Sequence, residues 1–394
     1  MKKLLSVLSV LLIVLSLCSF SVNAENVNSE AILTVNTEMQ VEVNAKACVL
    51  MDANTGTLLM GFNENEKLYP ASVTKIMTLL LVCEAIESGK LTLEMEITCS
   101  ESAAAKGGSQ IWLEPGEVMT VHELLKATVI YSANDACCLL GESVAGDEIA
   151  FCELMNKRAK ELGMNNTHFV NCTGLDDDVD DHKTTAFDIA IMSRELLKHE
   201  LIRNYTTIWM DSLRNGETQL VNTNKIIRTY PGATGLKTGT TSKAGCCVSA
   251  TAERDGLELI AVILGADNSK DRFSAAQKLL DWGFANYEIY SLNPENTYPG
   301  SIKVTHGVKQ ELNVTHSEAG EVLINKGAAD RIVSEVEIAE EIEAPVTKGQ
   351  NVGYVTFKVD GDIIGKCELT ADENIENMTF KNAIKAIFSS LKNN

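Results

Sequence analysis

The sequence lacks the short motifs that mark several common kinds of enzyme. It contains no G-x-S-x-G elbow, no H-E-x-x-H pair and no P-loop. No C-x-x-C pair occurs either, so we expect neither a zinc site nor another metal, and nothing indicates a cofactor. Internal repeats and low-complexity tracts are also missing. The sequence therefore gives no support to metal- or nucleotide-dependent chemistry.

Positive charge is scarce. The chain has 34 Lys and Arg against 54 Asp and Glu, which gives a formal net charge of −20. Such an acidic surface argues against nucleic acid as a partner, because it would repel the phosphate backbone. An anionic substrate would need a local cluster of positive charge.

The first residues predict export. Residues 1–24 carry a basic start, an apolar stretch and "VNA" with small residues at the −1 and −3 positions, as in a secretory signal peptide. The alternatives are an uncleaved membrane anchor and, more weakly, a lipoprotein at Cys18, which the bulky Leu17 disfavours. We expect residues 25–44, which are polar and irregular, to form a linker.

The chain has 11 cysteines, which in an exported protein invites a prediction of disulfides. Their placement argues otherwise. Cys83 and Cys152 lie inside apolar runs, where a free thiol packs as a small hydrophobic group. Cys137–Cys138 is an adjacent pair, a poor geometry for a mutual bridge. We predict reduced, packed thiols.

Hydrophobic periodicity predicts two folded parts and a terminal helix. Helical and strand patterns alternate over residues 45–290, and a turn-rich "NPENTYPG" marks a boundary. Short alternating stretches over 296–372 predict a small all-β domain. In 376–394, apolar residues recur at helical spacing, as in an amphipathic helix lying on a membrane surface. The alternative is a helix packed on its own protein.

Ser72 and Lys75, in "YPASVTKIMTLLL", stand where an apolar helix is expected to begin. Their spacing places a hydroxyl and an ammonium on one helical face, one turn apart. The pair is either a solvated first turn or a nucleophile beside its base. A lysine can act as that base only if its pKa falls.

Two further stretches favour the catalytic interpretation. "YSAND" supplies Ser132 and Asn134 near a helix start, where Asn134 alone would suggest a cap. "GLKTGTTSKAG" supplies Lys237, Thr238 and Gly239, which could bind a carboxylate and let a ligand approach the backbone. Alone it would be a loop-to-strand junction. All three motifs in this order are not expected by chance.

Together, S-x-x-K, S-x-N and K-T-G resemble the signature of penicillin-binding proteins and class A β-lactamases. "LYPASVTKIMT", "GSQIWLEPGE", "NTHFVNCTGLDD" and "AQKLLDWGF" are similar to the secreted D-alanyl-D-alanine carboxypeptidases of that group. The resemblance implies an α/β (α+β) DD-peptidase or serine β-lactamase-like catalytic domain. It would comprise an antiparallel sheet with flanking helices and a helical subdomain, followed by a small all-β domain and a C-terminal amphipathic helix.

The resemblance also implies how the motif residues act. Ser72 would be the acylated nucleophile and Lys75 its general base. Ser132 would relay a proton to the leaving D-alanine, while Lys237 helps to keep Lys75 neutral. The backbone N–H groups of Ser72 and Thr240 would form an oxyanion hole.

The same resemblance assigns the substrate-binding residues. Asn134 would hydrogen-bond the substrate's peptide amide. Lys237 and Thr238, followed by Gly239, would receive the terminal carboxylate. Arg272 matches a family arginine that adds positive charge to that pocket. No metal is implied.

The resemblance thus implies a serine carboxypeptidase that removes the terminal D-alanine of peptidoglycan stem pentapeptides and binds β-lactam antibiotics. We expect it at the extracytoplasmic face of the bacterial membrane or in the cell wall. The alternatives are a DD-endopeptidase or β-lactamase of the same fold, or a catalytically silent wall-binding protein. A class A β-lactamase would need a glutamate that activates the deacylating water, and no such loop is evident. His182 is interpreted as structural.

Overall fold

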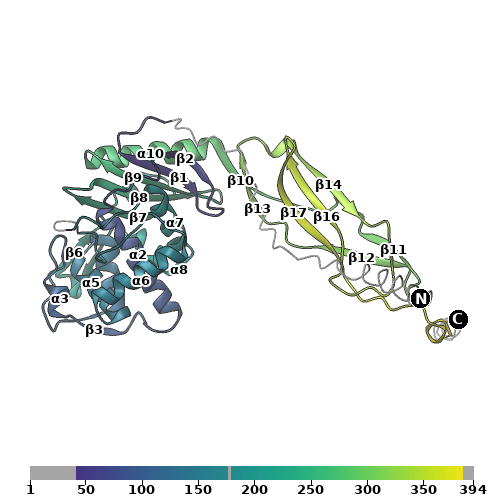
Figure 1. The fold of residues 1–394 in the computed structure, drawn as a ribbon, viewed down its shortest axis with the longest axis horizontal. Helices are drawn as coiled ribbons and strands as arrows, with labels where there is room; N and C mark the ends of the chain where they lie inside the picture. The colour runs from purple at the N-terminus through teal and green to yellow at the C-terminus, as the bar shows by residue number, and fades with distance from the viewer. Residues whose placement is uncertain (1–40, 176–178, 385–394) are drawn as a thin grey trace, which may run out of the picture.

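The computed structural model describes residues 41–175 and 179–384 (Figure 1). The predicted signal peptide, most of the predicted linker and residues 385–394 of the predicted terminal helix lie outside this range.

The larger part is organised around a five-stranded antiparallel sheet. Its strand order is β2-β1-β9-β8-β7, so the N-terminal hairpin is joined to strands that come late in the sequence. The strands are β1 (Ala47–Asp52), β2 (Leu58–Phe62), β7 (Ala233–Thr241), β8 (Gly245–Arg254) and β9 (Leu257–Ala266). The turn-forming stretches "DANTG" and "ERDG" join β1 to β2 and β8 to β9.

Both faces of this sheet are buried. Alternate residues of β1 point to opposite sides: Ala47 and Val49 join one apolar cluster, whereas Cys48 and Leu50 join another. The long helix α10 (Ser269–Asn286) covers the second face, and α2 (Lys75–Glu87) and α7 (Ala186–Leu197) lie on the first (Figure 1).

Helix α2 is the centre of the larger part. Nearly all its residues, from Lys75 to Cys83, are buried. A helix that is apolar all round must be enclosed by other elements. The remaining helices are α3 (Glu101–Ala104), α4 (Val121–Lys126), α5 (Asn134–Ala145), α6 (Glu148–Glu161), α8 (Glu200–Thr206) and α9 (Ile226–Thr229). Two small two-stranded sheets pair β3 (Glu96–Thr98) with β4 (Val118–Thr120), and β5 (Met210–Leu213) with β6 (Thr218–Val221). The short turn η3 covers Arg214–Gly216.

The second part is a domain of β-strands with its own core, which extends away from the first (Figure 1). A two-stranded sheet of β10 (Tyr287–Ser291) and β13 (Glu321–Asn325) adjoins the first part. The main sheet has the order β14-β16-β17-β12-β11-β15, with one parallel pair, β11 and β15. Its strands are β11 (Ser301–Thr305), β12 (Glu311–His316), β14 (Ile332–Ile338), β15 (Glu341–Glu343), β16 (Asn351–Val359) and β17 (Asp362–Ala371), with the short turn η4 at Ala329–Arg331. The fold class predicted from the sequence is confirmed.

Only the start of the predicted terminal helix is described. Residues 376–378 hydrogen-bond to 306–308, and the helical conformation begins at residue 380. Phe380 is 84% exposed and Ile384 is 37% exposed. Among the described residues, no helix is both long enough and apolar enough to span a bilayer.

His182 is a structural side chain. It is fully buried; its Nδ1 accepts the Val170 N–H at 3.1 Å, and its Nε2 lies 2.8 Å from Thr74 Oγ1. Because Nδ1 accepts a hydrogen bond, the proton of the neutral ring is on Nε2. Burial, reinforced by the nearby His168, lowers the pKa of His182 to about 4.

This environment predicts a loss of stability in acid. The unfolded chain takes up the proton near pH 6.5, whereas the folded chain resists it until about pH 4. The folded state should therefore lose about 3 kcal/mol as the pH falls through this interval. Chemical unfolding at several pH values measures it. The decline should be shallower in His182→Gln, whereas His306→Gln, at a histidine whose side chain is 77% exposed, should keep the wild-type slope. Equal slopes in all three proteins would contradict this account.

Candidate active site

Ser72 and Lys75 meet at the start of α2. Ser72 lies in η1 (Ala71–Thr74), a single 3₁₀ turn, and Lys75 is the first residue of α2. This turn places Lys75 Nζ 2.8 Å from Ser72 Oγ. The interpretation of the pair as a solvated first turn is wrong, because Lys75 is 0% exposed.

Among the described residues, the amine of Lys75 has three hydrogen-bond partners. Besides Ser72 Oγ, it lies 2.6 Å from Asn134 Oδ1 and 3.0 Å from the Thr173 carbonyl oxygen. The orientation of the Asn134 amide is fixed, because its Nδ2 donates to the Gly107 carbonyl at 2.7 Å. Both polar ends of Asn134 are thus engaged within the protein. Asn134 is the first residue of α5, and the N-cap residue, Ala133, makes no capping hydrogen bond through its side chain.

Ser132 has a strained backbone conformation. The π-helical turn η2 (Ala127–Tyr131) ends at Ser132, which has left-handed dihedrals of φ 65° and ψ 30°. Such conformations are unfavourable for a residue with a side chain and are concentrated at functional sites. Lys237 Nζ donates to Ser132 Oγ at 2.8 Å, so the structure brings the second and third motifs together.

The third motif lies inside a strand. Lys237, Thr238 and Gly239 form part of β7, and the apolar strand that follows them is β8. A Cβ added to Gly239 would lie 2.8 Å from the backbone nitrogen of Ser72. Glycine is therefore required for β7 to approach η1 this closely. The next residue, Thr240, is exposed at the end of β7.

Arg272 supports this strand from α10. Its Nη1 donates to the Gly239 carbonyl at 2.9 Å, to Thr240 Oγ1 at 2.9 Å and to the Cys247 carbonyl at 3.2 Å. The residue is only 7% exposed. The positive charge of Arg272 therefore lies next to the K-T-G motif. Its Nη1 is already occupied by the hydrogen bonds that hold β7 and β8.

Burial controls the ionisation of both lysines. Removal from water lowers the pKa of Lys75, and nearby Cys137, Cys172 and Asp135 only partly oppose this effect. Burial also lowers the pKa of Lys237 well below its ordinary value, and the positive charge of Lys75 lowers it further. It is therefore unfavourable for both amines to be protonated at the same time.

Sequence reasoning missed several residues that shape the site. The carbonyl of Thr173 binds Lys75, and Asn171 Oδ1 holds that turn by accepting N–H groups of Thr173 and Gly174 at 3.1 and 2.7 Å. Asp135 is buried and accepts the N–H groups of Ile111 and Leu113. In the sequence, Asn171 begins the stretch "NCTGLDD" and Asp135 follows "SAN". Neither stretch reveals which backbone groups these side chains contact.

Gly174 offers a test of this packing. A Cβ there would lie 1.8 Å from the Ala71 carbonyl oxygen, and φ is +85°. We expect Gly174→Ala to lower the free energy of unfolding by at least about 3 kcal/mol, from strain plus overpacking.

The matched control is Gly163→Ala, since Gly163 has φ +77° but nothing within 4 Å of its added Cβ. This variant should lose only about 1 kcal/mol, the cost of the backbone conformation. Denaturant unfolding of both variants separates the two contributions. Equal losses would show that the contact with η1 is unimportant.

Comparisons with known proteins agree with this geometry. Residues 34–268 match the family described as D-alanyl-D-alanine carboxypeptidase, and residues 287–377 match the family described as penicillin-binding protein 5, C-terminal domain. The two matches cover the two parts of the fold.

Individual relatives are similar over most of the chain. D-alanyl-D-alanine carboxypeptidase DacF of Bacillus subtilis (strain 168) is 41% identical over 345 residues, covering 86% of this chain and 88% of the relative. The structure of penicillin binding protein 5 from Haemophilus influenzae superposes with a TM-score of 0.72 at 28% identity, covering 86% and 99% of the two chains. Penicillin-Binding Protein D2 from Listeria monocytogenes, in its ampicillin-bound form, gives 0.57 at 30% identity, over 62% and 99%. The chain belongs to the D-alanyl-D-alanine carboxypeptidase family of low-molecular-mass penicillin-binding proteins.

Proposed function

We propose that this serine-type carboxypeptidase removes the terminal D-alanine of peptidoglycan stem pentapeptides through an acyl-enzyme on Ser72. The observation that carries the proposal is the set of three oxygens around the buried amine of Lys75.

This set fits a neutral amine. A neutral amine has two N–H donors and one lone pair. The Thr173 carbonyl and Asn134 Oδ1 can only accept, so they use both donors. The lone pair is then left to accept the proton of the Ser72 hydroxyl, 2.8 Å away. Lys75 is thereby suited to be the general base that activates Ser72.

The reaction then follows from these positions. Ser72 Oγ attacks the carbonyl carbon of the penultimate D-alanine as its proton passes to Lys75. The N–H groups of Ser72 and Thr240 stabilise the oxyanion. Ser132 relays the proton held by Lys75 to the leaving amino group, the peptide C–N bond breaks, and D-alanine departs. Water hydrolyses the resulting ester. A β-lactam would acylate the same serine.

Recognition of the terminal carboxylate would use the third motif. Lys237 and Thr238 would bind it, and Arg272 would add positive charge nearby. A bound carboxylate favours the protonated form of Lys237, and that charge in turn keeps Lys75 neutral. Asn134 would contact the substrate's amide only by loosening one of its present hydrogen bonds.

Fluorescent penicillin labelling tests the proposal. Ser72→Ala should not be labelled, and Lys75→Ala should be labelled at least about a hundredfold more slowly, because the general base is gone. Lys90→Ala, an exposed lysine beyond the end of α2, is the control and should react at the wild-type rate. Labelling of Ser72→Ala at the wild-type rate would overturn the role of Ser72, and near-normal labelling of Lys75→Ala would overturn that of Lys75.

We further infer how the parts are deployed. Residues 45–290 would be the catalytic domain and 296–372 the β domain. The terminal segment 376–394 would hold the enzyme on the extracytoplasmic membrane surface after cleavage of the signal peptide 1–24. The exposure of Phe380 and Ile384 supports this inference.

Truncation tests membrane association. Deleting residues 380–394 keeps the contacts of 376–378 with the β domain. We expect the truncated protein to stay in solution when vesicles are sedimented, while its hydrolysis of a D-Ala-D-Ala peptide is unchanged. Replacing the exposed Val333 by Glu, on β14, is the control and should not release the full chain. Vesicle binding by the truncated protein would contradict the anchor.

A further inference from the structure

A cluster of buried thiols lies directly behind the catalytic lysine. Cys137 and Cys138 are on α5, and Cys172 precedes Thr173 in the turn that binds Lys75. All three cysteines are 0% exposed. The ten cysteines within the described part of the chain are free, so these thiols are reduced in the structure.

Two of these thiols face a carboxylate from a third element. One ligand atom each from Cys138, Glu148 and Cys172 lies within 4.8 Å of the other two. Glu148 is the first residue of α6, and its Oε1 is 3.3 Å from Cys172 Sγ. Among the described residues, this is the one group of His, Cys, Asp or Glu side chains arranged closely enough to hold a metal ion.

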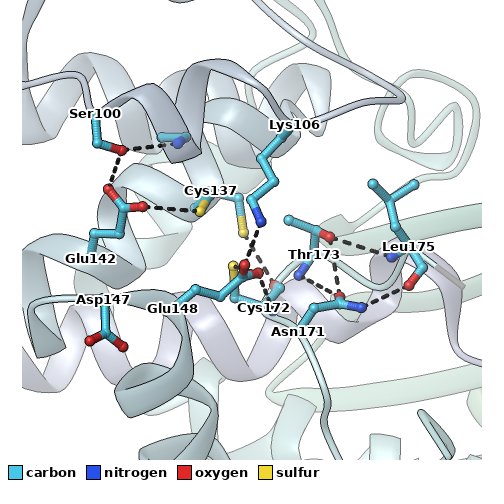
Figure 2. Close-up of polar contacts among 12 residues, drawn as sticks. Ser100, Lys106, Cys137, Glu142, Asp147, Glu148, Asn171, Cys172, Thr173 and Leu175 are labelled. Carbon is cyan, nitrogen blue, oxygen red and sulfur yellow. Dashed lines mark hydrogen bonds and ion pairs between the residues drawn. The ribbon is translucent and has the colours of Figure 1, made fainter. Parts of the chain in front are cut away.

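The carboxylate of Glu148 is held in place by its surroundings. Its Oε2 pairs with Lys106, and its Oε1 accepts the Cys172 N–H at 3.3 Å (Figure 2). The same view shows Asn171 holding the turn that leads to Thr173 and Leu175. Such outer contacts orient ligands and tune their affinity in metal sites.

The spacing fits a tetrahedral thiolate site. With Zn–S near 2.3 Å and Zn–O near 2.1 Å, the ligand atoms of such a site lie about 3.6–3.8 Å apart. In the structure, Cys172 Sγ and Glu148 Oε1 are 3.3 Å apart, and the three ligand atoms all lie within 4.8 Å of one another. Small side-chain movements would bring these separations to the values expected for a bound ion.

We propose that Cys138, Cys172 and Glu148 bind a thiophilic divalent cation of the Zn²⁺ type. Thiolate sulfur selects such cations over Mg²⁺ or Ca²⁺, and three protein ligands leave the fourth position for water. The thiols bind as thiolates and release their protons. The charge of Lys106 offsets part of the negative charge that the two thiolates and the Glu148 carboxylate place around the cation, and Glu142, whose Oε1 lies 3.6 Å from Cys138 Sγ, adds a second carboxylate nearby. The side chain of Glu148 is 18% exposed, which gives the ion an entry path.

The proposal differs from packing alone in what it explains. Thiols that act only as small hydrophobic groups need no carboxylate beside them. Here the carboxylate of Glu148, from α6, lies beside the sulfur atoms and is paired with Lys106, which follows α3. The bound ion would link α5, α6 and the turn at Cys172, next to the carbonyl that binds Lys75.

The test is metal binding by the purified full chain under anaerobic conditions. Titration with Co²⁺ should give intense near-ultraviolet absorption from thiolate-to-cobalt charge transfer, saturating at one ion per chain. Zn²⁺ should displace it. A wild-type protein without this absorption, or one that contains a Cys138–Cys172 disulfide as purified, would overturn the proposal.

Variants locate the site. Cys172→Ala and Cys138→Ala should each weaken the absorption and raise the dissociation constant at least tenfold, and Glu148→Gln should raise it about tenfold or more. The controls should bind as wild type does: Cys367→Ala removes a buried thiol of the β domain, and Glu153→Gln removes an exposed carboxylate of α6.

Fluorescent penicillin labelling shows that each variant is folded. The wild-type titration decides the question even if one variant does not fold. Unchanged Co²⁺ absorption in folded Cys172→Ala and Cys138→Ala would also contradict the proposal.

Discussion

The site depends on one buried amine, that of Lys75. An ammonium group without a carboxylate partner is costly to bury, and here burial lowers the pKa of Lys75. In the neutral form, the accepting oxygens of Asn134 and Thr173 would satisfy both N–H groups and leave the lone pair for the Ser72 hydroxyl. Burial therefore favours the neutral form of the amine that lies beside Ser72.

Two backbone contacts hold this arrangement together. Strand β7 approaches η1 so closely that only glycine fits at residue 239, which brings the end of β7 beside the Ser72 N–H. On the other side, Gly174 packs on Ala71 and presents the preceding carbonyl to Lys75. The helical region supplies Ser132, whose left-handed conformation turns its hydroxyl towards Lys237. Ser72 is thus enclosed by the sheet, a loop and the helices.

Much of this was predictable because it is local. Turn signals, alternation in the strands and the helical spacing of Ser72 and Lys75 all depend on neighbours in sequence, and the mixed helices and strands followed by a β-strand domain agree with these patterns. The engagement of Asn134 with Gly107, and of Arg272 with the Gly239 carbonyl, could not be predicted. Both contacts join distant segments, and side-chain type alone does not choose a partner.

The sequence by itself determined that Ser72 and Lys75 share one face of the chain, because residues three apart in a helical segment lie one turn apart. It also determined the two-part organisation, through the change in periodicity near residue 293. Only the tertiary structure decided that Lys75 is buried away from water and which oxygens surround its amine. It alone also brought Cys138, Glu148 and Cys172 together. Burial and ligand geometry arise from contacts between elements far apart in the chain, and no local spacing encodes them.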